Sequence, residues 1–95
     1  MCYYLDMLKK RQLEQIVRGF SNHRRIEILD LIERKPELSL SEITSELKIN
    51  LKTASGHVRR LIVAGLIMKR SQRNNIRHRL SKRGAAVLNF LKILE

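Results

Sequence analysis

The stretch that decides the fold is residues 39–80, SLSEITSELKINLKTASGHVRRLIVAGLIMKRSQRNNIRHRL. Its first part predicts a short helix, because Ser39 and Glu42 have the spacing of a capping box at a helix N-terminus, with Ser41 as a competing N-cap. Residues 48–50 then form a tight connection, whose last residue, an asparagine, is a good N-cap for a longer helix over residues 51–64. A short helix joined in this way to a longer one predicts a helix-turn-helix.

Two strand-like segments follow the longer helix. Gly65 is expected to end that helix as a left-handed cap, and residues 66–73 and 76–80 have strand-like patterns. Asn74-Asn75 between them suits a two-residue hairpin turn that needs positive φ. A helix-turn-helix followed by a basic β-hairpin predicts a winged helix-turn-helix.

The rest of the chain is helical in pattern. Gly19 is expected to stop a first helix over about residues 4–18, and Ser21 or Asn22 to cap a second that ends near residue 34. Ser81 is expected to cap a last helix over about residues 82–94. We therefore expect a single domain over residues 1–95 that is mainly α, with about five helices and a two-stranded antiparallel wing.

The net charge of +11 is divided unevenly along the chain. Residues 1–46 carry eight basic and eight acidic side chains, whereas residues 47–94 carry twelve basic side chains and no acidic one. A solvated surface usually mixes the two signs, so the one-signed half predicts a surface that binds a polyanion. Nucleic acid fits this pattern better than an acidic membrane or charge that serves solubility alone. With no Trp and 4% aromatic residues, stacking on single strands is disfavoured.

The longer helix of residues 51–64 has an apolar inner face and a basic outer face at 100° per residue. Lys and Arg reach phosphates or guanine edges, Ser and Thr bond either, and a helix fits the major groove. The hairpin is expected on the backbone or in the minor groove, because its arginines have no carboxylate nearby in the sequence. The candidate DNA-binding residues are Lys52, Thr53, Ser55, Gly56, His57, Arg59, Arg60, Arg70, Arg73, Arg77 and Arg79.

Three of these assignments have plain structural alternatives. Gly56 costs about 1 kcal/mol of helix stability relative to Ala, and it either lets the backbone approach DNA closely or is merely tolerated. His57 either bonds a phosphate or packs at the margin of the inner face. The hairpin arginines either contact DNA or protect exposed strand edges from aggregation.

The last predicted helix is apolar almost all round. From Ala85 to Leu94 only Asn89 and Lys92 are polar, whereas a terminal helix of a monomer needs a single apolar stripe. We therefore expect a homodimer built from the first and last helices, which sets two recognition helices about one DNA turn apart on a pseudo-palindromic operator. The alternative is that the last helix folds wholly onto its own domain. The candidate interface residues are Leu5, Leu8, Val87, Leu88, Leu91 and Leu94.

Three segments resemble a known family. Residues 20–29, FSNHRRIEIL, resemble the second-helix signature of ArsR-type regulators, which is roughly Leu-Ser-Asp-Pro-x-Arg-x-x-Ile-Leu. Arg25 matches the arginine of this signature, and His23 replaces its proline. Residues 40–67 are similar to the family's helix-turn-helix, including a Ser-x-His pair, and residues 78–84, HRLSKRG, resemble the strand-to-helix junction of winged-helix regulators. MarR-type regulators share much of this pattern.

The resemblance implies a dimeric transcriptional repressor without the family's metal sites. Metal-sensing members carry a Cys-x-Cys-type pair on the third helix, or His and carboxylate ligands on the last. Here residues 41–47 read SEITSEL, and residues 82–94 contain no His, Cys, Asp or Glu. No metal and no cofactor are therefore expected. Cys2, the single cysteine, cannot form an internal disulfide.

Other classes of protein fit less well. No nucleophile–base arrangement with a supporting motif and no Gly-rich phosphate loop is present, so no enzyme is expected. The longest uncharged apolar run, residues 61–68, falls short of the ~20 residues that span a membrane, and we expect a cytoplasmic protein. The alternatives that remain are a winged-helix module for protein–protein interaction in a larger assembly and a non-specific DNA or RNA binder.

Overall fold

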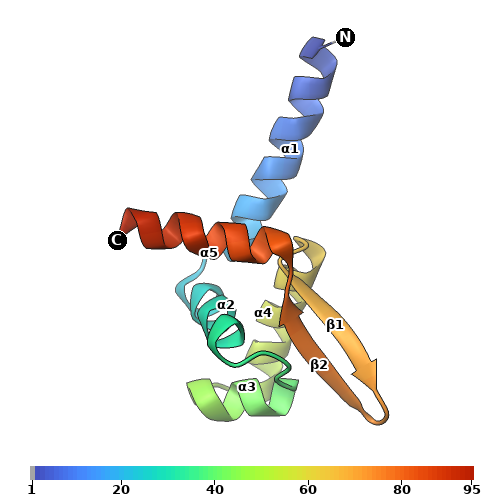
Figure 1. Ribbon diagram of the computed structural model, residues 1–95, viewed down its shortest axis with the longest axis vertical. Coiled ribbons are helices and arrows are strands. Elements are labelled where there is room, and N and C mark those ends of the chain that lie inside the picture. The colour runs from blue at the N-terminus through green and yellow to red at the C-terminus, as the bar shows by residue number, and fades with distance from the viewer. Residues whose placement is uncertain (1) are drawn as a thin grey trace.

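The computed structural model describes the backbone of residues 2–95 and the side chains of residues 9–95. The described chain folds into five helices and one antiparallel hairpin, which confirms the predicted mainly α fold with a two-stranded wing (Figure 1). In chain order the elements are α1 (Cys2–Phe20), α2 (His23–Arg34), α3 (Leu40–Leu47), α4 (Leu51–Val63), β1 (Ile67–Gln72), β2 (Asn75–Leu80) and α5 (Lys82–Leu94).

The core of the domain forms around α2, which contacts all the other helices and β2. Four of its side chains, Ile28, Leu29, Leu31 and Ile32, are buried. Burial of an apolar side chain of this size contributes about 1.5–3 kcal/mol, so this helix anchors the others. The remaining buried core residues are Leu38, Ile43, Val58, Leu61, Ala64, Leu66, Ile67, Val87 and Leu88.

The helix ends of the helix-turn-helix lie where the capping residues predict them. Ser39 accepts a hydrogen bond from the backbone N–H of Glu42, and the Glu42 carboxylate accepts one from the backbone N–H of Ser39. Asn50 caps α4 through its side-chain oxygen, and Gly65 follows the helix with φ +79°. These local interactions fix the direction in which α4 leaves the turn, and so the face it exposes.

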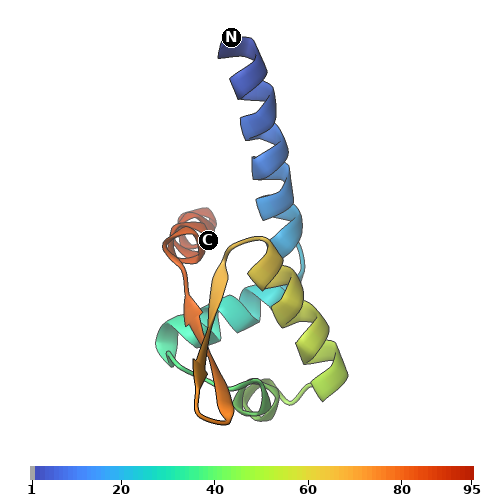
Figure 2. The ribbon, with the colours of Figure 1, turned by 90° about the vertical axis from the view of Figure 1, so that its right-hand side faces the viewer.

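The first helix differs from the sequence prediction, because α1 continues through Gly19 to Phe20. Gly19 is buried, and a methyl group added to it would collide with the side chain of Ala64 at the end of α4. The glycine therefore permits close packing of α1 on α4 and does not end the helix. Beyond this contact α1 projects away from the rest of the domain (Figures 1 and 2).

Two glycine substitutions should have opposite effects on stability. Gly19→Ala is expected to lower the free energy of unfolding by about 1–3 kcal/mol, because the added methyl group overpacks the contact with Ala64. Gly56→Ala is the matched control, since no atom lies within 4 Å of the added methyl group, and it should raise stability by up to about 1 kcal/mol. Urea denaturation measures both, and equal stability of the two variants would contradict the packing role of Gly19.

The hairpin turn lies one residue earlier than predicted. Gln72 pairs with Asn75, so the turn is Arg73-Asn74 and not Asn74-Asn75, and Arg73 has the positive φ of 55°. In this register Ile67 pairs with Leu80 at the base of the wing, where Ile67 and His78 are buried. The alternation of side chains does not distinguish the two turns, because the predicted turn would pair Arg73 with Ile76 and would leave Ile67 and His78 on the same face.

No helix in the part of the chain that the structure describes is long and apolar enough to cross a membrane.

Candidate nucleic-acid interface

The outer face of α4 is basic and open to solvent, as predicted. Its inner side chains Ala54, Val58 and Leu61 are buried. Half-buried Ser55 and His57 border the exposed face. The exposed residues on the outer face are Lys52, Thr53, Gly56, Arg59, Arg60 and Val63.

His57 lies against a group of arginines at the side of α4. Burial, together with the positive charges of Arg25 and Arg60, lowers the pKa of His57 from its usual value. The imidazole is therefore neutral at physiological pH and adds no charge to the outer face. A neutral ring can still donate or accept one hydrogen bond at the edge of the interface.

Arg25 joins the first two helices, a role that the sequence analysis did not assign to it. Its guanidinium donates hydrogen bonds to the backbone carbonyls of Arg18 and Gly19, both at 3.1 Å. Burial and the nearby charge of Arg60 lower the pKa of Arg25. The contact satisfies carbonyls at the C-terminus of α1, which a cation stabilises.

Three of the four wing arginines have carboxylate partners, contrary to the expectation from the sequence. Arg77 pairs with Glu42 at 2.9 Å, and Arg70 and Arg79 lie 3.8 and 3.9 Å from the carboxylate of Glu37. The expectation failed because the fold brings the α2–α3 loop and α3, which belong to the neutral half of the chain, beside the wing.

The four wing arginines therefore differ in how freely they can meet a ligand. Arg70, Arg73 and Arg79 are exposed, whereas Arg77 is half-buried and also donates to the backbone carbonyl of Glu37 at 3.3 Å. Arg73 occupies the tip of the hairpin, and no described carboxylate lies within 4 Å of it. The tip arginine is thus the most available and Arg77 the least.

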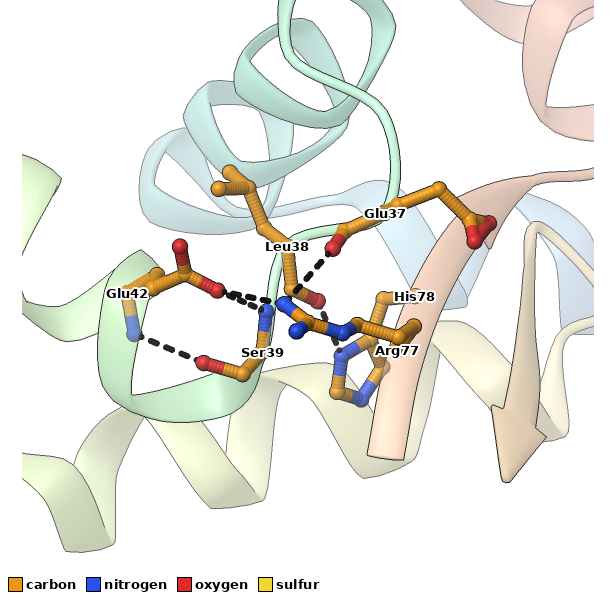
Figure 3. Close-up of polar contacts among 6 residues, drawn as sticks. All are labelled: Glu37, Leu38, Ser39, Glu42, Arg77 and His78. Carbon is orange, nitrogen blue, oxygen red and sulfur yellow. Dashed lines mark hydrogen bonds and ion pairs between the residues drawn. The ribbon is translucent and has the colours of Figure 1, made fainter. Parts of the chain in front are cut away.

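The base of the wing is attached to the α2–α3 loop by a backbone bridge that the sequence did not reveal. The N–H of Glu37 donates to the carbonyl of His78 at 3.1 Å, and the N–H of His78 donates to the carbonyl of Leu38 at 3.0 Å. The buried His78 ring also contacts that Leu38 carbonyl through Nδ1 at 2.9 Å, which requires the hydrogen on Nδ1 (Figure 3). At the base of the wing β2 is therefore paired on both of its edges, with β1 on one side and with the α2–α3 loop on the other.

The wing and α4 lie on opposite sides of one open cleft. Its volume is about 430 Å³, and its walls include Arg59 and Val63 from α4, Lys69 from β1 and Ile76 from β2. Figure 2 shows the hairpin beside α4. A helix and a basic hairpin side by side can meet a groove and the adjacent backbone of one duplex.

The candidate dimer residues are not equally placed. Val87 and Leu88 are 9% and 3% exposed, so they belong to the core of their own domain, and Leu91 also packs against it. Leu94 is 66% exposed. Leu5 and Leu8 lie outside the described side chains. The large apolar side chains that are exposed on α1 and α5 differ from the predicted set. They are Leu13, Val17, Phe90, Ile93 and Leu94, and we call them the exposed apolar set.

No three His, Cys, Asp or Glu side chains gather into a possible metal site among residues 9–95. The side chain of Cys2 lies outside the described residues. Nothing in the described interface therefore offers a set of metal ligands.

Comparison with known proteins gives one family and many structural neighbours. The model of the MarR family matches residues 22–78, from the start of α2 into β2, and no curated protein matches the chain. HlyU from Vibrio cholerae N16961 is 25% identical, with a TM-score of 0.79 over 90% of this chain and 94% of that one. MarR from E. coli in its oxidised form is 16% identical, with a TM-score of 0.69 over 95% of this chain and 69% of that one.

A third neighbour is similar over most of its length. The homodimeric winged helix-turn-helix DNA-binding domain of Mb0332 from Mycobacterium bovis, a possible ArsR-family transcriptional regulator, is 24% identical, with a TM-score of 0.85 over 93% of this chain and 82% of that one. The family that the sequence matches is MarR, where the motifs had suggested an ArsR-type protein. The chain therefore belongs to the MarR family, and its winged helix-turn-helix fold is that of DNA-binding transcription regulators.

Proposed function

We propose that the protein is a sequence-specific regulator of transcription that binds double-stranded DNA as a homodimer. In each subunit α4 enters the major groove, and the wing contacts the backbone or the minor groove. The observation that carries the proposal is the exposed basic face of α4 beside an arginine-rich wing. Within the MarR family, the FSNHRRIEIL signature of residues 20–29 favours an ArsR-like member that acts as a repressor.

The dimensions and chemistry of α4 suit the major groove. A helix of 13 residues is about 20 Å long, and the groove is about 12 Å wide. Arg59 is exposed on the outer face, and its guanidinium can bond the O6 and N7 atoms of guanine. Lys52 in the first turn is suited to a phosphate. A module for protein–protein interaction would expose apolar or mixed-charge residues here, whereas the exposed large apolar side chains of α4 are Leu51 and Val63, at its two ends.

The exposed apolar set supports pairing of two chains. Leu13 and Val17 lie on the projecting helix α1, and Phe90, Ile93 and Leu94 lie on the last turns of α5. Complete burial of a fully exposed apolar side chain contributes about 1.5–3 kcal/mol, and these side chains, which are half or more exposed, gain the corresponding share of it. A second copy of the chain offers the same apolar residues, as a two-fold interface requires.

Substitutions in α4 and in the wing should separate base recognition from backbone contact. Selection of bound genomic DNA fragments first provides a cognate site. Arg59→Ala is then expected to cost about 1–3 kcal/mol on that site and to relax discrimination at one base pair. Arg73→Ala should weaken cognate and random duplexes alike, because a phosphate contact carries no sequence information.

Lys92→Ala provides the control for these variants. It removes the same charge from α5, where Lys92 pairs with Glu33 at 2.7 Å, and should leave binding within about twofold of the unaltered protein. Electrophoretic shift or fluorescence anisotropy titrations at one salt concentration measure all three variants. Loss of binding with Lys92→Ala equal to that with Arg59→Ala would show that total charge alone drives the interaction and would contradict the proposal. Equal affinity for double-stranded RNA would do the same.

A further inference from the structure

Glu37 holds its carboxylate between two arginines of the wing. Its oxygens lie 3.8 Å from the guanidinium of Arg70 on β1 and 3.9 Å from that of Arg79 on β2. Its Oε1 atom is buried and accepts no hydrogen bond from the described residues. One carboxylate thus faces two guanidinium groups of the wing, the element that contacts the DNA backbone or minor groove in the proposed function.

The backbone of Glu37 is attached to β2. Its N–H donates to the carbonyl of His78, and its own carbonyl accepts from Arg77 (Figure 3), so the residue is held beside the wing. Glu37 also has a φ of +69°, a conformation that favours glycine or asparagine over glutamate. The backbone conformation at this position therefore does not favour a glutamate. The two guanidinium groups do favour one, because they attract its negative charge.

A neighbouring ion pair in the same region has a shorter donor–acceptor distance. Glu42 accepts a hydrogen bond from Arg77 at 2.9 Å, and Arg77 is half-buried. Hydrogen bonds from Ser39, with a smaller effect of Arg77, lower the pKa of Glu42. The contacts of Glu37 are about 1 Å longer and fall outside the 2.7–2.9 Å range of charge-assisted hydrogen bonds. Arg70 and Arg79 can therefore exchange Glu37 for an anion that forms shorter bonds.

We propose that Glu37 is an internal substitute for a DNA phosphate, which competes for Arg70 and Arg79 and so limits the sequence-independent affinity of the wing for DNA. The proposal rests on the proposed function, since it assumes that the wing meets the DNA backbone. Carboxylate and phosphate oxygens both accept hydrogen bonds from the guanidinium fork. A duplex must displace Glu37 before it gains these two contacts, whereas contacts by Arg73 at the tip carry no such cost.

The test compares two substitutions that change the net charge equally. Glu37→Gln removes the competitor, and Glu33→Gln removes a carboxylate of similar exposure, 35% against 34%, which pairs with Lys92 on α5. Affinity for a random-sequence duplex is measured from about 50 to 200 mM salt. We expect Glu37→Gln to bind about 3- to 10-fold more tightly at the lowest salt, as two exposed ion pairs allow. Its slope of log affinity against log salt should steepen by about 0.9 for each added phosphate contact.

Three outcomes would overturn the inference. The first is that Glu37→Gln and Glu33→Gln bind the random-sequence duplex with equal affinity. This result would contradict the inference but not the proposed function. The second is weaker binding by Glu37→Gln. The third is absence of duplex binding by the unaltered protein, which removes the proposed function as well. Glu37→Gly, which suits the positive φ and removes the side chain altogether, repeats the test should the glutamine variant melt at a lower temperature.

A double-mutant cycle adds an independent measurement. Arg70→Ala should reduce affinity for random duplex more in the Glu37→Gln background than in the unaltered protein, because Glu37 no longer holds this guanidinium. The same ratio in both backgrounds would show that Arg70 and Glu37 are not coupled, and would also overturn the inference.

Discussion

Raising the salt concentration from about 50 to 200 mM is expected to weaken the binding of a duplex by about 10³–10⁵-fold. Each phosphate neutralised by Lys or Arg releases condensed counterions, and log affinity falls by about 0.9 per phosphate for each unit of log salt. The basic face of α4 and the exposed wing arginines of two subunits make six to ten such contacts reasonable. Anisotropy titrations with a labelled duplex at four or more salt concentrations measure this slope.

The combined variant Lys52→Ala/Arg73→Ala serves to assign the slope to the proposed surface. Both residues are exposed, one on α4 and one at the tip of the wing. The variant should lower the magnitude of the slope by about 1.8 for each subunit that engages DNA through them. A nearly flat salt dependence of the unaltered protein, or a slope that this variant leaves unchanged, would contradict the placement of the interface.

Ile93→Glu is expected to convert a dimer into a monomer that retains its fold. Ile93 is 74% exposed near the end of α5, so a charge there leaves the core of the domain intact. In a two-fold interface the substitution places two carboxylates in an apolar contact, where an unpaired charge is costly. Light scattering at micromolar concentration should give about twice the chain mass of 11.2 kDa before the change and the chain mass after it.

Ala85→Glu is the matched control for this substitution. Ala85 is exposed on the same helix, two turns before Ile93 and close to the wing, and its substitution adds the same charge. It should leave the dimer unchanged. Leu88→Glu is unsuitable, because Leu88 is buried in the core and its loss would unfold the domain. A mass near 11 kDa for the unaltered protein would rule out the proposed dimer.

The sequence predicts those parts of the fold whose causes are local. The capping box of Ser39 and Glu42 and the caps at Asn22 and Asn50 need only three or four neighbouring residues, and each lies at the predicted helix end. The outer face of α4 also follows from local periodicity, since burying Val58 and its neighbours leaves Arg59 exposed. Such features can be read from the chain without knowing what packs against it.

Features that depend on distant partners were not predictable in the same way. Helix α5 is apolar around its circumference, so periodicity gave no reason to bury Val87 and Leu88 and to expose Phe90 and Ile93. The pairing of Glu37 with the wing depends on a backbone bridge between segments 40 residues apart in the sequence. The distribution of charge along the sequence therefore predicted a wing without nearby carboxylates, whereas in the folded chain Glu37 and Glu42 lie beside the wing arginines.

The contact between Gly19 and Ala64 has a mechanical consequence. It brings the backbone of the projecting helix against the side chain of Ala64 at the end of α4, with no flexible group between them. A rotation of α1 would therefore have to shift the end of α4, and also α2, whose Arg25 side chain bonds the same end of α1. In a pair of chains joined through their α1 helices, the angle at the joint would set the spacing and the tilt of the two α4 helices together.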